Sequence, residues 1–461
     1  MGKIEIQNNI MAERKRIYLC LAHMSDEGIE QKYIKEAFDT NWVVPLGPNV
    51  NGFEKDLESF VGQDKRVVAL SAGTAAVHLA LIACGVGPGD EVCVQSFTFC
   101  ASSHPITYLG ATPVFIDSEK ETWNMDPELL EVAIKDRIAK TGKKPKAIVP
   151  VALYGMPYKI DRIMEIANKY DIPVIEDAAE GFGSKYNGQV LGTFGKYGVL
   201  SFNGNKMITT SGGGALITPD EESWREIMMY ATQYRESYPY YQHEKIGYNY
   251  RMSNICAGIG RGQMTVANDH IAHHKHVQGL YEELLKDVPG IHVHSQPNLP
   301  SLEGGAGGRL YDSNYWLCTI TIDKDVKVKG QENAYKTIVT GAVGGAAGVI
   351  HAAESATTDC QPNENVEALR VFMDAAGIEA RPVWKPMHKQ PVYCAPINEK
   401  GKMTNEQLPC GAICQTSGSS VAYVNGVSEE IFKVGMCLPA GPYVTDEDVK
   451  YIVETIKSAI E

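Results

Sequence analysis

The alternation of short apolar runs with helical stretches limits the possible folds of this chain more than any other feature. Between the short apolar runs, apolar residues recur at helical spacing over 75–84, 127–138 and 160–169, which predicts helices there. Continuous apolar strands separated by helices indicate an α/β fold, with a mostly parallel sheet covered on both faces. Ligands bind beyond the carboxyl ends of the strands in such sheets, so candidate functional residues should follow the runs. The seven runs span 67–70, 91–95, 112–116, 147–151, 173–176, 198–202 and 214–217.

Length and composition favour more than one domain. The chain has 461 residues, and 44% of them are hydrophobic, which is enough to bury a large core. We predict an N-terminal arm and opening helix at 1–62, a large domain at 63–290 and a smaller C-terminal α+β domain at 291–461.

The predicted C-terminal domain combines strands, helices and two insertions. The insertions lie near 341–361, which is rich in glycine and alanine, and near 399–420, which is polar, so both are predicted to be loops. The regular elements are β runs at 315–322 and 378–383 and helices at 365–376 and 445–460.

Charge and cysteine content argue against several classes of protein. A net charge of −13 disfavours binding to nucleic acids or membrane surfaces, so an anionic ligand would need a local cluster of basic groups. The 11 cysteines are scattered without a Cys-x-x-Cys pair, which favours reduced thiols in a cytoplasmic protein. No apolar run is long enough to span a bilayer, and the first residues are too charged for a signal peptide.

No metal site is expected. A long helix is predicted from residue 255 past 276, and it carries His270, His273, His274 and His276. No carboxylate or cysteine completes a ligand set with them, so a polar helix surface is the better interpretation.

Residues 71–74 (Ser-Ala-Gly-Thr) follow the first run and lead directly into a helix. Small and hydroxyl residues at a helix N-terminus leave backbone N–H groups free for an anion, which the helix dipole also favours. An ordinary N-cap by Ser71 or Thr74 is the alternative. Because no Gly-Lys-Thr is present, a single phosphate is favoured over a nucleotide P-loop.

Two further strand ends carry groups that suit a charged ring. Phe99 follows the second run and could stack on a flat heteroaromatic ring, although a core position is the alternative. Residues 176–180 (Glu-Asp-Ala-Ala-Glu) close the fifth run. Carboxylates there are costly to desolvate without a cationic partner, and a protonated pyridine nitrogen would serve.

Lys206 lies in a tight loop between the last two runs, with glycines at 212–214 after it. Glycine tolerates positive φ and close approach of another group, which suits a lysine that must meet a cofactor. A solvated surface lysine is the alternative. Residues 42–50 form an apolar loop with Pro and Gly, which is either a packed connector or a lid over a site.

A phosphate turn, a stacking aromatic, an aspartate and a loop lysine, in that order along one sheet, are what pyridoxal phosphate needs. The chain resembles the sugar aminotransferases of the DegT/DnrJ/EryC1/StrS family from about residue 23 to 457. The resemblance implies the aspartate-aminotransferase-like fold of type I pyridoxal phosphate enzymes. Its motifs lie at 71–74, 98–99, 176–180, 201–206, 247–252 and 384–388.

The resemblance also implies roles at the cofactor. Lys206 would bind it covalently and move protons, Asp177 would keep the pyridine nitrogen protonated, and Phe99 would stack on the ring. Asn249 would reach the partner's phosphate in a homodimer with a shared active site. Glu180 would lie near the cofactor hydroxyl, where many relatives have Gln or His, so it must be protonated or matched to a donor. The residues implied to hold the phosphate are Ala72, Gly73, Thr74 and Ser201.

Within the family the chain is most similar to enzymes that aminate UDP-linked 4-keto-6-deoxy N-acetyl sugars, as in bacillosamine-type glycan synthesis. The similarity rests on 240–254 and 381–388. It implies transfer of an amino group from L-glutamate to C4 of such a sugar. Basic side chains would meet the nucleotide diphosphate and the loop at 45–49 could close over the sugar. The candidate substrate-binding residues are Pro45, Asn49, Arg235, Arg251, Lys385 and His388.

Two other functions are weighed against this one. A sugar dehydratase of the same family would have histidine in place of Lys206. A regulatory or scaffold protein would keep the fold without catalysis. The presence of both Lys206 and Asp177 argues against each of them.

Overall fold

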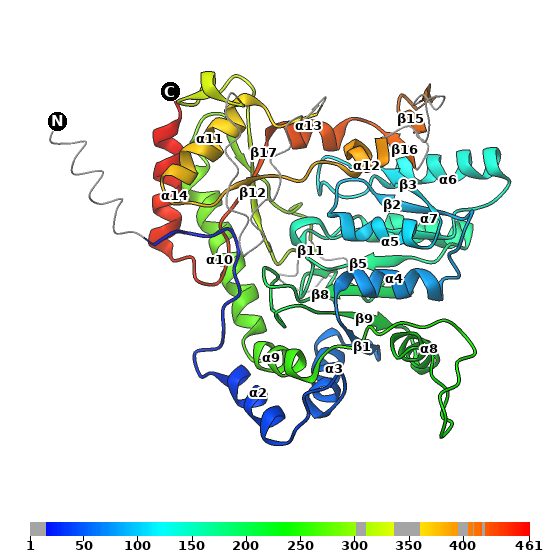
Figure 1. Cartoon of the computed structure of the whole chain (residues 1–461). Coiled ribbons are helices and arrows are strands. Elements are labelled where there is room, and N and C mark those ends of the chain that lie inside the picture. Colours follow the sequence, from blue (N-terminus) through cyan, green and yellow to red (C-terminus); the bar gives the residue numbers. More distant parts are fainter. Residues whose placement is uncertain (1–14, 301–309, 336–359, 395–403, 409, 417–419) are drawn as a thin grey trace.

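The computed structural model describes residues 15–300, 310–335, 360–394, 404–408, 410–416 and 420–461 (Figure 1). The large sheet lies to the right in Figure 1, and a smaller unit with the C-terminal helix lies to the left. Within the described part of the chain, no helix is both long and apolar enough to cross a membrane.

One large sheet forms the centre of the molecule. Its order is β1-β9-β8-β5 followed by β4-β2-β3-β16-β15-β14, and isolated bridges from Ile148 to Val174 and from Val151 to Asp177 join β4 to β5. Pairings are parallel across the middle and antiparallel at both edges, so the predicted mostly parallel sheet is confirmed. The strands are β1 (Arg66–Leu70), β2 (Glu91–Gln95), β3 (Thr112–Ile116), β4 (Ala147–Val149), β5 (Ile175–Asp177), β8 (Tyr197–Ser201), β9 (Gly214–Thr218), β14 (Thr404–Gln407), β15 (Ile413–Thr416) and β16 (Val421–Val424).

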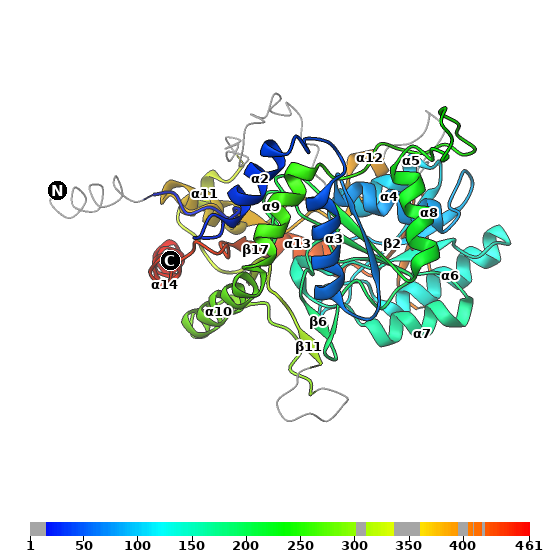
Figure 2. The ribbon, with the colours of Figure 1, turned by 90° about the horizontal axis from the view of Figure 1, so that it is seen from below.

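Helices cover both faces of this sheet because successive strand residues point to opposite sides. Val67 and Ala69 pack in one apolar cluster, whereas Val68 and Leu70 pack in another on the opposite face. Figure 2 shows α6 and α7 on one side and α4 and α8 on the other. The covering helices are α3 (Pro48–Val61), α6 (Pro127–Thr141) and α7 (Ile160–Tyr170) on the first face, and α4 (Gly73–Ala83), α5 (His104–Tyr108), α8 (Glu221–Ala231) and α12 (Pro391–Cys394) on the second.

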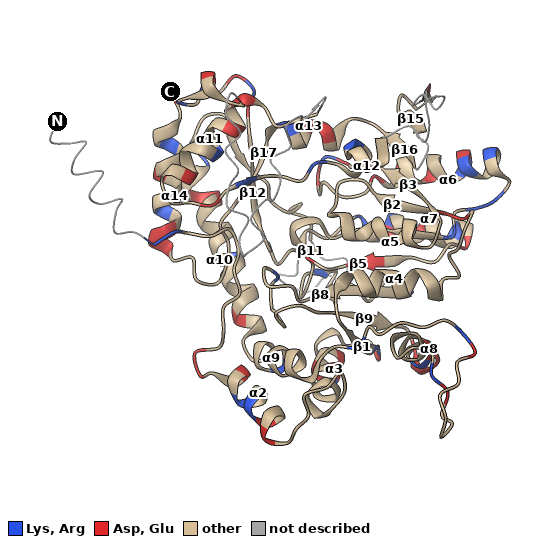
Figure 3. Cartoon of the chain, in the orientation of Figure 1, with Lys and Arg blue, Asp and Glu red and all other residues tan. Residues whose placement is uncertain are grey.

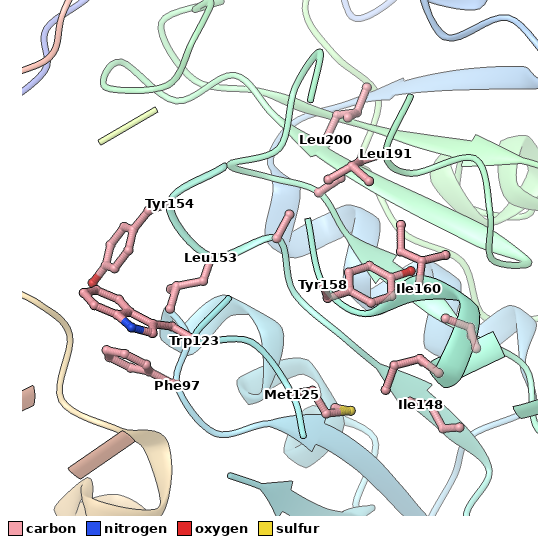
Figure 4. Packing of buried hydrophobic residues seen from close by; sticks show 14 of the residues in the cluster. Phe97, Trp123, Met125, Ile148, Leu153, Tyr154, Tyr158, Ile160, Leu191 and Leu200 are labelled. Carbon is pink, nitrogen blue, oxygen red and sulfur yellow. The ribbon is translucent and has the colours of Figure 1, made fainter. Parts of the chain in front are cut away.

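The first cluster extends toward the carboxyl ends of the strands. Phe97, Trp123 and Tyr154 lie together on the left of Figure 4, and Tyr158 and Ile160 lie on the right. Rings of Phe97 and Tyr154 meet edge to face with centroids 6.5 Å apart, a favourable geometry for aromatic pairs. This packing supports the loops in which the candidate site residues lie.

A second, smaller core lies in the C-terminal part of the chain. Val277 and Tyr281 of α10 pack there with Ile320 and Ile452. Its strands pair antiparallel in the order β10-β12-β17-β13. The elements around this core are α10 (Ala267–Leu285), β10 (Ile291–Val293), β12 (Cys318–Ile322), η3 (Gln331–Asn333), α11 (Glu364–Ala375), β13 (Arg381–Pro382), β17 (Gly435–Leu438) and α14 (Asp446–Ala459). The helix α13 (Val427–Val434) precedes β17 in the chain but packs in the first cluster.

The predicted long helix after residue 255 is wrong in its length, because the chain forms two helices. α9 (Asn254–Met264) ends where the Thr265 backbone N–H and hydroxyl both donate to the Gly262 carbonyl. Val266, with φ −114° and ψ 3°, separates α9 from α10. A Cβ on Gly260 would come 2.7 Å from the Phe53 ring, so the glycines of α9 let it pack tightly on α3 and α2 (Ile29–Asp39).

Residues 399–420 also differ from the prediction of a loop. Their described part forms the hairpin β14–β15, which continues into β16. Val421 of β16 pairs in parallel register with Val114 of β3, so the hairpin extends the large sheet. Residues 341–359 of the other predicted insertion lie outside the described residues.

Three smaller features complete the fold. The segment between α8 and α9 protrudes from the body beside α8 in both Figure 1 and Figure 2. Charged residues are spread over outer helices such as α6 and α14, whereas α4 carries none (Figure 3). A small antiparallel sheet combines β6 (Lys185–Tyr186), β7 (Gln189–Val190) and β11 (Tyr311–Asp312).

Candidate active site

Lys206 lies in the loop between β8 and β9, where its backbone N–H donates to the Asn203 carbonyl at 3.0 Å. Its Nζ lies 3.2 Å from Glu180 Oε1 and 4.0 Å from the centroid of the Trp316 ring. The side chain is only 12% exposed. The surface-lysine alternative therefore fails, because this ammonium is enclosed by a carboxylate and an aromatic face.

Glu180 follows β5, and its carboxylate contacts the Lys206 ammonium. Its Oε1 accepts from Lys206, and its Oε2 accepts from the Tyr154 backbone N–H at 2.8 Å. Burial raises the pKa of the Glu180 carboxyl, while the nearby Lys206 ammonium and the Tyr154 N–H act in the opposite direction. Tyr154 belongs to the short 3₁₀ turn η2 (Leu153–Gly155) after β4.

Asp177 is the last residue of β5 and is buried. Its Oδ2 accepts from the Ser102 hydroxyl at 2.6 Å, and its Oδ1 accepts from the Ala179 backbone N–H at 3.1 Å. Burial raises the pKa of Asp177, which these hydrogen bonds and Lys206 partly offset. No cationic side chain contacts this carboxylate directly among the described residues, which leaves room for a cation on a bound ring.

The start of α4 lies at the end of β1, beside the end of β8. Ala72 is the N-cap, and no side chain caps the helix, so the alternative of an ordinary cap by Ser71 or Thr74 is not realised. A Cβ on Gly73 would come 3.0 Å from Ser201 Cβ, so glycine lets Ser201 lie against the helix start. Free N–H groups of the first turn next to a serine hydroxyl suit a phosphate.

Phe99 is not a core residue, because 54% of it is exposed. Its ring centroid lies 5.5 Å from that of Trp384, which in turn lies 5.1 Å from that of Tyr154. η1 (Cys100–Ser102) follows directly and carries Ser102 toward Asp177. An exposed ring next to a buried carboxylate fits the stacking alternative.

The apolar loop at 42–50 borders a pocket rather than only connecting helices. Pro45 lines a cavity of about 350 Å³ together with Ser71 and Gly212. Asn49 lies in α3 and is buried, with its backbone N–H donating to Asn254 Oδ1 at 2.9 Å. Pro45 thus lies near the start of α4, whereas Asn49 is bonded within the fold.

The two arginines predicted to meet a diphosphate have different surroundings. Arg251 lines the same cavity, but its guanidinium is buried and donates to the Glu54 carboxylate and to the Ala69 carbonyl. Arg235 is exposed on the protruding segment, over the ring of Tyr241 at 5.2 Å. Asn249 is exposed on the same segment.

The 384–388 motif spans Trp384 and the 3₁₀ turn η4 (Met387–Lys389). The His388 side chain is 1% exposed, and its Nδ1 lies 2.6 Å from Ser96 Oγ while its Nε2 lies 3.2 Å from Glu429 Oε1. Lys385 is half-buried beside Trp384. The histidine therefore links the end of β2 to α13.

Three residues at this site were missed by the sequence analysis. Ser102 could have been found, because it follows the second run by a short loop like the other candidates. Tyr154 and Trp316 have no local signal, since they reach the site only through tertiary packing. Trp316 lies just before β12, and its Nε1–H donates to the Asn205 carbonyl at 2.7 Å.

These groups fit pyridoxal phosphate. The fit rests on a buried carboxylate without a charged partner side chain, a glycine cradle at an uncapped helix, and an enclosed lysine between them. No group of three or more His, Cys, Asp or Glu that could hold a metal ion occurs among the described residues.

Comparison with known proteins gives consistent matches. The model of the DegT/DnrJ/EryC1/StrS aminotransferase family matches residues 25–333. EpsN of Bacillus subtilis (strain 168) is 38% identical over 442 residues, covering 96% of this chain and 95% of that protein. GDP-perosamine synthase of Escherichia coli O157:H7 is 31% identical over 441 residues, covering 95% and 98%.

Two further matches are a relative whose name includes its substrate and a protein of known structure. UDP-2-acetamido-2-deoxy-3-oxo-D-glucuronate aminotransferase of Pseudomonas aeruginosa is 38% identical over 244 residues, covering 53% of this chain and 65% of that protein. The crystal structure of a DegT DnrJ EryC1 StrS aminotransferase from Brucella abortus superposes with a TM-score of 0.73 at 26% identity, covering 94% and 95%.

Proposed function

Because the chain belongs to the DegT/DnrJ/EryC1/StrS aminotransferase family, a family of pyridoxal phosphate-dependent sugar aminotransferases, we propose a specific transfer for it. The amino group moves from L-glutamate to C4 of a UDP-linked 4-keto-6-deoxy sugar, in the cytoplasm, for a surface glycan or glycoprotein. The observation that carries the catalytic assignment is the enclosed Lys206 amine, 3.2 Å from Glu180.

The geometry of the site supports the following cofactor-side roles. Lys206 is the covalent residue and holds or moves the proton at the reacting carbon. Asp177 pairs with the ring nitrogen, and Phe99 stacks on the ring. The ring, when bound, supplies the electron sink for the broken C–H bond. The phosphate is held by Ala72, Gly73, Thr74 and Ser201.

The substrate proposal rests on the names of relatives, on local sequence similarity and on local charge. The name of the Pseudomonas relative includes a UDP-linked sugar, and that of the Escherichia coli relative includes GDP. Similarity of residues 240–254 and 381–388 to enzymes of UDP-linked 4-keto sugars favours UDP. In an acidic protein the diphosphate needs local positive charge, and Lys385 and Arg235 have no carboxylate partner among the described ion pairs that would occupy them.

We further propose a homodimer with shared active sites. The protruding segment exposes apolar side chains next to Asn249, which suits burial against a second copy. In the dimer Asn249 then contacts the phosphate of the partner's cofactor. The large exposed side chains of the segment are Tyr238, Tyr240, Tyr241 and Ile246.

The substrate proposal is tested by incubating the purified holoenzyme with L-glutamate and either the UDP-linked or the GDP-linked 4-keto-6-deoxy sugar. We expect the amino sugar only from the UDP substrate, identified by mass spectrometry with ¹⁵N-labelled glutamate. Amination of only the GDP sugar would overturn the nucleotide assignment. Loss of water without gain of ¹⁵N would instead favour the dehydratase.

The shared site is tested by mixing two inactive variants. In a shared site, Lys206 comes from one protomer and Asn249 from the other. A mixed dimer of Lys206→Ala and Asn249→Ala therefore has one site with both residues intact and should regain part of the activity. Sedimentation would show a dimer in each sample. A monomer, or no recovery in verified mixed dimers, would contradict the proposal.

A further inference from the structure

The charged pair formed by Lys206 and Glu180 poses a chemical problem for the proposed function, on which this inference rests. An ammonium has no lone pair, so Lys206 must lose a proton before its nitrogen can attack an aldehyde carbon. The pair is almost fully enclosed, with the two side chains 12% and 3% exposed. The proton therefore needs an acceptor inside the site.

We propose that Glu180 is the base that takes this proton from Lys206. The N–H bond of the ammonium breaks and an O–H bond forms on Glu180 Oε1, so a charged pair becomes a neutral amine and a neutral acid. The freed nitrogen then forms the bond to the aldehyde carbon, and the aldehyde oxygen leaves as water. The same transfer runs backward whenever the lysine is released.

Geometry supports Glu180 in this role over the other groups near it. Lys206 Nζ donates to Glu180 Oε1 at 3.2 Å, within reach for direct transfer. Asp177 is instead bonded to Ser102 and Ala179, and no hydrogen bond joins it to Lys206 among the described contacts. Trp316 covers the ammonium with its ring face, which cannot accept a proton.

Two hydrogen bonds hold Glu180 in place, one at its carboxyl and one at its backbone. Its Oε2 accepts the Tyr154 N–H, and its backbone carbonyl accepts from Asn314 Nδ2 at 2.8 Å. Asn314 Oδ1 in turn accepts the Trp316 N–H at 2.8 Å, so one asparagine positions both the base and the ring over the lysine. Oε1 is left as the oxygen that faces the amine.

The charges around Glu180 favour proton uptake once the ammonium is neutralised. Burial and the Asp177 charge raise the pKa of Glu180, whereas Lys206 and the Tyr154 N–H lower it. The remaining titratable groups facing it are the Tyr154 and Cys437 side chains, and burial raises the pKa of both. Loss of the Lys206 charge removes the main opposing influence.

The test measures covalent loading of cofactor-free protein with pyridoxal phosphate, followed by stopped-flow absorbance at several pH values. Glu180→Gln keeps the shape but cannot accept the proton, so we expect loading near pH 7 to be about a hundredfold slower. The deficit should shrink as pH rises, because solution base then removes the proton. Asp161→Asn, at a carboxylate bonded to Tyr186 on the outside of α7, is the matched acid-to-amide control and should load normally.

A second measurement separates this role from a structural one. Pyridoxamine phosphate has no aldehyde and needs no amine from Lys206, so Glu180→Gln should bind it with a Kd within about threefold of the unmodified protein. Equal losses in both measurements, or normal loading by Glu180→Gln at neutral pH, would overturn the proposal. Covalent loading of Lys206→Ala would instead refute the lysine assignment itself.

Discussion

The cofactor side and the substrate side of the candidate site differ in how their residues are held. Asp177 is the last residue of β5, and Lys206 and Phe99 follow β8 and β2 of the same sheet. Arg251 and His388 lie on connecting segments, and each is already bonded within the chain, to Glu54 and to Ser96 with Glu429. The order of the strands thus determines where each strand end lies. It does not determine which partner a long polar side chain bonds to.

The sharpest test of the cofactor side is Lys206→Ala. We expect a folded protein whose turnover rate falls by about a hundredfold to ten-thousandfold, because both the covalent bond and the proton carrier are lost. Steady-state transamination assays and thermal unfolding measure the two properties. Substantial multiple turnover by the variant would remove the central residue of the cofactor side.

On the substrate side, Arg251→Gln tests whether this arginine serves stability or binding. It leaves the buried Glu54 carboxylate unpaired, so we expect unfolding free energy to fall by about 3–5 kcal/mol in urea titrations. Adding Glu54→Gln should restore much of the loss. A raised KM for the sugar with unchanged stability would instead support the diphosphate role predicted from sequence.

His388→Ala should have a smaller effect of the same kind. It leaves Ser96 and Glu429 without their common partner, and we expect a loss of about 1–3 kcal/mol in unfolding free energy. Lys385→Ala, at a neighbouring half-buried position, is the control and should leave stability nearly unchanged. Should the His388 variant keep full stability but bind the sugar less well, the contrast between the two sides would disappear.

The smallest expected effect concerns pH and the cofactor-free protein. Burial raises the folded-state pKa of Glu180 above its unfolded value, so its contribution to stability is present at low pH and is lost as pH rises through the folded pKa. Glu180→Gln removes this contribution, and Tm should therefore fall less steeply between pH 4 and pH 8 than in the unmodified protein. Parallel Tm profiles would show that Glu180 keeps an ordinary pKa.

The sequence predicted seven strands of the large sheet, from β1 to β9 in the chain, because each of these apolar runs is a strand with buried residues, but it did not predict β14, β15 and β16. The runs at 91–95 and 112–116 coincide with β2 and β3. It failed where local pattern is weak: Thr265 ends a helix through a backbone contact, and residues 404–407 and 413–416 pair as an edge hairpin. Trp316 could not be predicted at Lys206, because only tertiary packing brings these two residues together across a long stretch of chain.

Site chemistry was predictable only in part, for the same reason. The order of phosphate turn, aromatic, aspartate and lysine follows from strand ends, so it is visible along the chain. The pairing of Lys206 with Glu180, and of Arg251 with Glu54, depends on distances between segments far apart in sequence. Whether a predicted basic residue is available to a ligand is therefore a question for the structure.

The position of β16 beside β3 has a consequence for how the protein is made. β3 leaves the ribosome roughly 300 residues before β16, an interval of about 15–60 s at usual rates of synthesis. During that time the β3 edge of the nascent sheet has no partner and is open to wrong pairing. β16 is translated late and pairs with that edge of β3. The complete sheet therefore forms only when nearly the whole chain has been released.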